Sequence, residues 1–124
     1  MNKNRRPIIA IDFDGTIVRH EYPEVGKLLP DAAKTIRWLH DWADIIIWTC
    51  RYTTEDIEQM KLFLSYENIP YDSINANMPS ILFRPIPKIY FDIGIDDRNI
   101  GGLPSWNEIR NILEKEKCKW TEEG

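Results

Sequence analysis

The sequence predicts a three-layer, Rossmann-like α/β sandwich around a mainly parallel sheet of about four strands. Residues 8–11 and 45–48 are almost continuously apolar. They lack the alternation of a half-exposed strand, which indicates strands covered on both faces. Segments with helical spacing of apolar residues separate these runs. Strands that alternate with helices are typical of parallel sheets with right-handed crossovers.

Length and composition bound the class of protein. A chain of 124 residues with 43% hydrophobic and 29% charged residues predicts one globular domain spanning 1–124. No apolar run approaches the roughly 20 residues that span a bilayer, and no signal-peptide core precedes the first strand. We therefore expect no membrane association and a cytoplasmic location. The net charge of −4 argues against long nucleic acid as a partner without excluding it.

The first half of the chain predicts two strands separated by a flap and a helix. Residues 17–29 are polar, with a proline and a glycine, and predict a small β-hairpin flap over the carboxyl end of the first strand. His20 lies in this flap, and we interpret it as an exposed histidine rather than a catalytic group. A helix is expected to open at Pro30 and Asp31, because both residue types suit a first turn. Residues 44–51 predict the second strand.

The second half predicts two further helices and two further strands. A helix is expected to begin at Thr53 or Thr54, with an acidic first turn. A short strand follows at 71–76, and then a proline-punctuated loop at 78–88 that cannot be a central strand. Residues 89–98 predict the fourth strand, and a final amphipathic helix begins near Pro104.

Chemically active side chains follow three of the predicted strands. Asp12 and Asp14 end the first strand, and Asp96 and Asp97 end the fourth. Because parallel strands end at one edge of the sheet, we expect these carboxylates to meet there. Four carboxylates repel one another unless a cation neutralises them, and Mg²⁺ prefers such oxygen ligands.

Cations and a hydroxyl near the same edge predict a phosphate site. Thr49 and Arg51 end the second strand, and Lys88 precedes the fourth. A carboxylate can attack phosphorus to form an aspartyl-phosphate, while a second carboxylate protonates the leaving oxygen and later activates water. A cysteine phosphatase built on Cys50 would need an arginine at position 56, which is Asp56.

The combination of these residues resembles the haloacid dehalogenase superfamily. Its four motifs match, in order, Asp12-Phe13-Asp14-Gly15-Thr16, then Thr49, then Lys88, then Asp96-Asp97. The resemblance implies a capless, Mg²⁺-dependent phosphohydrolase acting on a small phosphate monoester.

The resemblance also implies roles for individual residues. Asp12 would be the nucleophile and a metal ligand, and Asp14 the general acid/base, with its backbone carbonyl on the metal. Thr49 and Lys88 would hold the phosphoryl group. One of Asp96 and Asp97 would complete the metal site, with Asp97 favoured. The predicted substrate-binding residues also include Arg51, Gly15 and Thr16.

Two features depart from the family pattern. Lys88 stands only eight residues before Asp96, so it could instead be an ordinary lysine flanking a strand. The gaps between the motifs are too short for a cap domain. We therefore expect the site to be covered by the flap or by a partner subunit. In the second case the protein would be a homo-oligomer.

Alternatives remain open within and outside this class. The runs Thr49-Cys50-Arg51 and Ile95-Asp96-Asp97-Arg98 also resemble the phosphatase domain of polynucleotide kinase-phosphatases, and the spacing from Lys88 resembles deoxyribonucleotidases. A nucleotide or a polynucleotide end is therefore an alternative substrate. A receiver-like phosphoacceptor signalling domain uses similar residues, but its phosphorylated Asp lies mid-chain and its Lys comes last. A non-catalytic relative that binds phosphorylated ligands conflicts with the intact Asp12 and Asp14.

Overall fold

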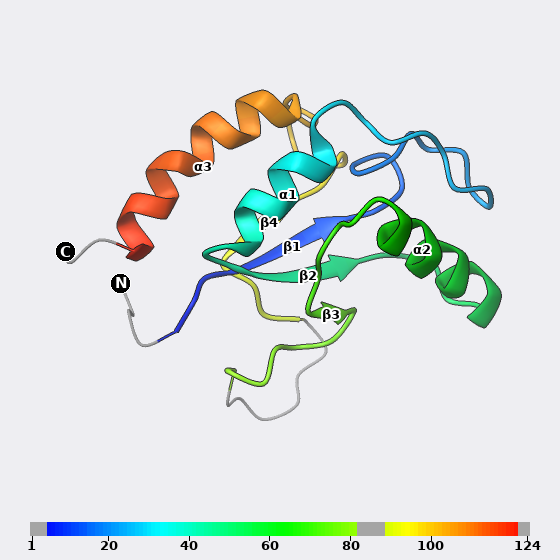
Figure 1. The fold of residues 1–124 in the computed structure, drawn as a ribbon, viewed down its shortest axis with the longest axis horizontal. Coiled ribbons are helices and arrows are strands. Elements are labelled where there is room, and N and C mark those ends of the chain that lie inside the picture. The colour runs from blue at the N-terminus through cyan, green and yellow to red at the C-terminus, as the bar shows by residue number, and fades with distance from the viewer. Residues whose placement is uncertain (1–4, 82–88, 122–124) are drawn as a thin grey trace.

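The computed structural model describes residues 5–81 and 89–121. Its elements, in chain order, are β1 (Ile8–Asp12), α1 (Ala32–His40), β2 (Asp44–Trp48), α2 (Thr54–Tyr66), β3 (Ser73–Ile74), β4 (Ile93–Ile95) and α3 (Trp106–Thr121). The strands form one sheet in the order β3-β2-β1-β4, and every pairing is parallel (Figure 1). The predicted α/β class and four-stranded parallel sheet are confirmed.

The register of β1 with its neighbours brings the strand ends together. Asp12 is level with Trp48 of β2, and Ile11 is level with Ile95 of β4. The residues that follow β2 and β4 therefore emerge beside Asp12. This edge is where the sequence predicts the candidate site residues.

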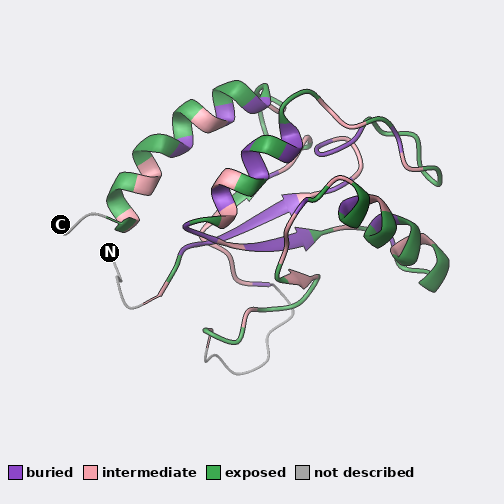
Figure 2. Cartoon of the chain, viewed as in Figure 1, coloured by how far each residue is buried: buried purple, intermediate pink, exposed green. Residues whose placement is uncertain are grey.

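The two faces of the sheet are covered differently. Ile9 and Ile11 of β1 pack in a large core to which all three helices contribute. Ile8 and Ala10 point to the other face, where a smaller core includes Ile89. The described residues between β3 and β4, which contain no helix, run beneath that face (Figure 1). The three layers are therefore helices, sheet and non-helical chain, and β1 and β2 are buried between them (Figure 2).

Residues 17–29, which the sequence predicts as a small β-hairpin flap, form a loop between β1 and α1 that contains no regular strand. An antiparallel bridge between Val18 and Leu28 closes its base. The N–H of Arg19 also donates to the carbonyl of Lys27 over 2.8 Å. A Cβ atom on Gly26 would lie 2.1 Å from the Arg19 carbonyl oxygen, so only glycine fits there. The close pairing at the base keeps the flap over the strand ends.

Several element boundaries differ from the expected ones. β2 ends at Trp48 rather than at residue 51, and β4 covers only three of the ten residues predicted as strand. Upstream of β4, the N–H of Tyr90 donates to the side chain of Asn77 and not to a strand. α1 starts at Ala32, after an Asp31 in a left-handed conformation. The predicted start of α2 is confirmed, since the Thr53 side chain caps it.

None of the helices within the described ranges is long and apolar enough to cross a membrane.

Candidate functional site

The chain turns sharply after β1, and this turn positions the first group of site residues. Gly15 has a φ of 90°, and its N–H donates to the carbonyl of Val18 over 2.8 Å. A Cβ atom at this position would lie 2.4 Å from Asp97 Oδ2. Glycine therefore satisfies both the left-handed backbone and the close approach of the Asp97 carboxylate.

Thr16 links the ends of β1 and β4. It is fully buried, and its hydroxyl donates to Asp12 Oδ2 over 2.9 Å. The Thr16 hydroxyl oxygen also accepts the backbone N–H of Asp97 over 3.0 Å. The indole N–H of Trp106, at the start of α3, donates to the Thr16 carbonyl. Gly15 and Thr16 thus hold the acidic residues in place, and their predicted contact with substrate stays a prediction.

Three carboxylates converge at this edge of the sheet. Asp12, Asp96 and Asp97 each offer an oxygen, and these oxygens lie within 4.8 Å of one another. Within residues 5–81 and 89–121, no lysine, arginine or histidine forms an ion pair with any of the three. Burial, with repulsion from Asp96 and Asp97, raises the pKa of Asp12 to about 7, although the Thr16 hydrogen bond acts in the opposite direction. The cluster therefore carries negative charge that the described side chains leave unbalanced.

This donor set fits a hard divalent cation. All the donors are carboxylate oxygens, and their spacing allows one ion to contact all three residues. Mg²⁺ is commonly held by one to a few carboxylates, with water and substrate oxygens completing its coordination. Asp12, Asp96 and Asp97 would hold such an ion, and the predicted contribution of Asp14 comes from its backbone carbonyl.

The carboxylate of Asp14 has a different partner. Arg51 donates from Nε to Asp14 Oδ2 and from a terminal nitrogen to Oδ1, both over 2.8 Å. The Arg51 side chain is fully buried, and it also donates to the flap carbonyls of Pro23 and Glu24. The guanidinium thus fixes Asp14 and the flap. The predicted binding of phosphate by Arg51 stays a prediction.

Thr49 makes contacts with its own loop and with Asn75. The Thr49 hydroxyl accepts the backbone N–H of Arg51, and the amide side chain of Asn75 pairs with the Thr49 N–H and carbonyl, each over 2.8 Å. Thr49 does not line the cavity described next. Lys88 lies outside the described residues. Their predicted roles in holding a phosphoryl group stay predictions.

A cavity of about 290 Å³ opens at the carboxylate cluster. Five of the predicted site residues line it: Asp12, Asp14, Arg51, Asp96 and Asp97. The others that line it are His20, Tyr22, Cys50, Tyr52 and Arg98. His20 is exposed, as expected, and also borders the cavity. Tyr52 and Arg98 directly follow predicted site residues, which is a signal that could have identified them, whereas no pattern indicates Tyr22.

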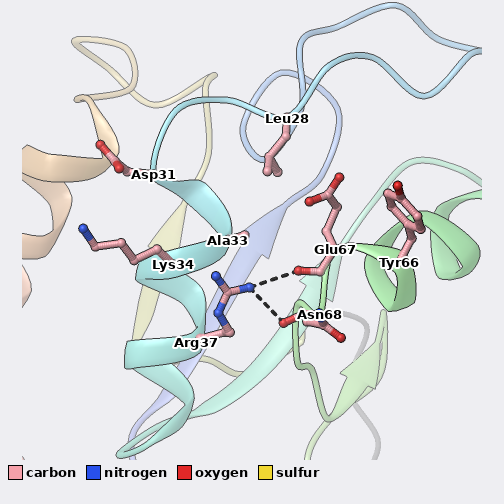
Figure 3. A pocket seen from close by; sticks show the side chains of 8 residues that line it. All are labelled: Leu28, Asp31, Ala33, Lys34, Arg37, Tyr66, Glu67 and Asn68. Atoms are coloured by element: carbon pink, nitrogen blue, oxygen red, sulfur yellow. Dashed lines mark hydrogen bonds between the residues drawn. The ribbon is translucent and has the colours of Figure 1, made fainter.

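A larger hollow elsewhere lacks comparable chemistry. It measures about 560 Å³ and lies between α1 and the end of α2 (Figure 3). Arg37 points across it and donates to the carbonyls of Glu67 and Asn68. The acidic cluster of the described residues lies at the strand ends and not here. Volume alone therefore does not identify the functional site.

The fold and the acidic edge together define a small α/β domain with a Rossmann-like parallel sheet and a candidate cation site at its strand ends. A solved structure of a conserved protein from Bacteroides thetaiotaomicron is similar, with 31% sequence identity and a TM-score of 0.80. The match covers 90% of this chain and 93% of that one, so the chain belongs to the family of that conserved protein. The name of that relative states no activity. No family model and no curated protein matches the chain.

Proposed function

We propose that the protein is a Mg²⁺-dependent phosphohydrolase of the haloacid dehalogenase type that cleaves a small phosphate monoester. The convergence of Asp12, Asp96 and Asp97, with no cationic partner among the described residues, carries this proposal. Uncompensated carboxylates are costly in a partly buried site. Their arrangement is understandable if a cation normally neutralises them.

The first step of the proposed reaction uses Asp12 as the nucleophile. A carboxylate oxygen of Asp12 attacks phosphorus, and the bond from phosphorus to the ester oxygen breaks, leaving an aspartyl-phosphate. When bound, Mg²⁺ would neutralise phosphate charge and favour the ionised form of Asp12. The hydrogen bond from Thr16 orients Asp12 for this attack.

The second step uses Asp14 as a base. Asp14 takes a proton from water, whose oxygen attacks phosphorus and releases inorganic phosphate from Asp12. The two hydrogen bonds from Arg51 hold the Asp14 carboxylate in a fixed orientation, which suits this role. In the first step, Asp14 would give a proton to the leaving oxygen, and the water of the second step returns that proton.

A phosphatase assay tests the proposal. The purified protein is assayed with p-nitrophenyl phosphate and a panel of sugar phosphates and nucleotides, with Mg²⁺ and with a chelator. We expect turnover that the chelator abolishes and that Mg²⁺ restores. Asp12→Asn should abolish it, whereas Asp41→Asn, an exposed position at the end of α1, should not.

Two results would overturn the proposal. One is turnover that survives chelation or is unchanged in Asp12→Asn. The other is absence of turnover on every substrate together with stable labelling of an aspartate by a small phosphodonor, which would favour the receiver-like alternative.

A further inference from the structure

Two tyrosines line the same cavity as the carboxylates, and the proposed chemistry uses neither. Tyr22 comes from the flap and is 44% exposed, while Tyr52 follows β2 and is 83% exposed. A tyrosine ring presents a large apolar face that is stabilised by stacking against another planar group. Two such rings beside a candidate phosphate site point to the part of the substrate that lies beyond the phosphate.

The ring of Tyr22 is held in a defined position. Its hydroxyl donates to the carboxylate of Asp56 in the first turn of α2. The guanidinium carbon of Arg51 lies 5.0 Å from the ring centre, and Arg51 is itself fixed by Asp14. Because the ring is already ordered, stacking a ligand on it costs little additional conformational entropy.

Tyr52 lies where two hollows adjoin. It lines both the acidic cavity and a second hollow of about 620 Å³ alongside β3, and Arg51 also lines both. Tyr71 and Lys61 line the second hollow further along. A ligand with its phosphate at the carboxylates can therefore extend past Tyr52 into the wider space.

We propose that the substrate carries a planar ring on its leaving side, and that it is a nucleoside monophosphate whose base stacks on Tyr22 and Tyr52. This proposal rests on the proposed phosphatase function and names its substrate class. Tyrosine stacks on any base, because every base has a π-face. Aryl phosphates share the planar ring, but the adjoining hollow of about 620 Å³ favours the longer nucleoside.

Kinetics of matched substrates test this proposal. We compare kcat/KM for adenosine 5′-monophosphate, ribose 5-phosphate and phenyl phosphate, which separate base, sugar and simple ring. The variants are Tyr52→Leu, Tyr22→Leu and the ring-retaining Tyr52→Phe, since Tyr22→Phe would also remove the hydrogen bond to Asp56. Tyr66→Leu is the control, because Tyr66 is also 83% exposed but lines the hollow in Figure 3.

The expected result is a loss of preference confined to the two leucine variants in the site. The wild type should prefer adenosine 5′-monophosphate to ribose 5-phosphate, and Tyr52→Leu should reduce that preference about tenfold. Phenylalanine should restore it, and Tyr66→Leu should leave it unchanged. An identical preference in all variants would overturn the proposal, and a stronger preference for phenyl phosphate would replace the nucleoside with an aryl ester.

A binding measurement separates this proposal from the phosphatase proposal. Saturation-transfer NMR detects adenosine 5′-monophosphate and ribose 5-phosphate on the protein whether or not either is hydrolysed. If nothing is hydrolysed but the nucleotide binds and Tyr52→Leu weakens its binding about tenfold, only the proposed reaction fails. If phosphates are hydrolysed but the nucleotide binds no better than ribose 5-phosphate, only the substrate class fails.

Discussion

Both ends of the sheet carry aspartates, but the aspartates at the two ends differ in whether basic side chains pair with them. At the amino end, Asp92, Asp44 and Asp72 pair with Arg5, Arg6 and His40 over 2.8, 3.6 and 3.2 Å. At the carboxyl end, the oxygens of the Asp12, Asp96 and Asp97 cluster lie within 4.8 Å of one another. None of these three forms an ion pair within the part of the chain that the structure describes.

The difference teaches which aspartates serve the fold. Asp92 and Asp72 each accept a backbone N–H at the start of the neighbouring strand, from Ile8 and Ile45 respectively, over 2.8 Å. These carboxylates therefore satisfy backbone N–H groups at strand ends as well as contacting Arg5 and His40. Among residues 5–81 and 89–121, the Asp12 carboxylate accepts its hydrogen bond from Thr16 and none from a neighbouring strand, which is consistent with a role in binding rather than in the fold.

The pKa values of Asp12 and Asp92 express the same contrast. Burial by itself acts to raise the pKa of both carboxyls. At Asp92 the hydrogen bonds from Arg5, Tyr90 and the Ile8 N–H outweigh burial, and the pKa is lowered. At Asp12 the neighbouring carboxylates add to burial, and the pKa rises to about 7. The partners, rather than the residue type, decide the direction.

Exchanging one aspartate at each end for asparagine should separate catalysis from stability most strongly. We expect Asp12→Asn to lower kcat by at least about a thousandfold, because it removes the proposed nucleophile. Asp92→Asn should keep kcat close to that of the wild type while lowering the midpoint of thermal unfolding. Steady-state kinetics and calorimetry measure the two effects. Equal kinetic losses in both variants would contradict the division between the two ends.

The buried arginine at the carboxyl end should matter more for stability than the arginine at the amino end. The side chain of Arg51 is fully buried and that of Arg5 is 16% exposed. Arg51→Met leaves the Asp14 charge without its partner and should lower the free energy of unfolding by about 3 kcal/mol. Arg5→Met should lower it by about 1 kcal/mol. Urea unfolding measures both, and a larger loss in Arg5→Met would reverse the comparison.

The sheet and the position of the acidic edge could be predicted because they depend on local patterns. Apolar runs identify β1 and β2, and the residues after a parallel strand lie at one edge whatever the loops do. Asp12, Asp14, Asp96 and Asp97 were placed at that edge by this argument alone. The structure brings all four to one cavity.

The contacts within the site could not be predicted, because they depend on side-chain directions set by tertiary packing. The sequence places Arg51 beside the strand end but does not show whether its guanidinium faces a ligand or Asp14. The side-chain amide of Asn75, after β3, hydrogen-bonds to the backbone of Thr49, after β2. No periodic pattern in the sequence predicts this contact. The sequence also did not predict that non-helical chain between β3 and β4 covers one face of the sheet. Prolines exclude a central strand but do not indicate where the chain packs.

Magnesium should stabilise the protein through the carboxyl end alone. At a free concentration about 100 times its Kd, a ligand that binds only the folded state adds about 2.7 kcal/mol to the free energy of unfolding. We expect Mg²⁺ to raise the unfolding midpoint of the wild type and of Asp72→Asn, but not that of Asp97→Asn. Thermal unfolding with Mg²⁺ and with a chelator checks this. A response retained in Asp97→Asn would place the cation elsewhere.

The smallest expected effect is an opposite pH dependence at the two ends, measured with a chelator present. The pKa of folded Asp12 is about 7 against an ordinary 3.8, so between these values the folded state binds more protons than the unfolded state. The free energy of unfolding should therefore fall as the pH rises through this window, by about 1 kcal/mol after allowance for the exposure of Asp12. The pKa of folded Asp92 is below 3.8, so its contribution is present above that value and is lost as the pH falls through the folded pKa. Urea unfolding across pH should show the first slope flattened in Asp12→Asn and the acid loss reduced in Asp92→Asn. If both residues contributed slopes of the same sign to the free energy of unfolding against pH, their partners would not determine their pKa shifts. That result would contradict the contrast between the two ends.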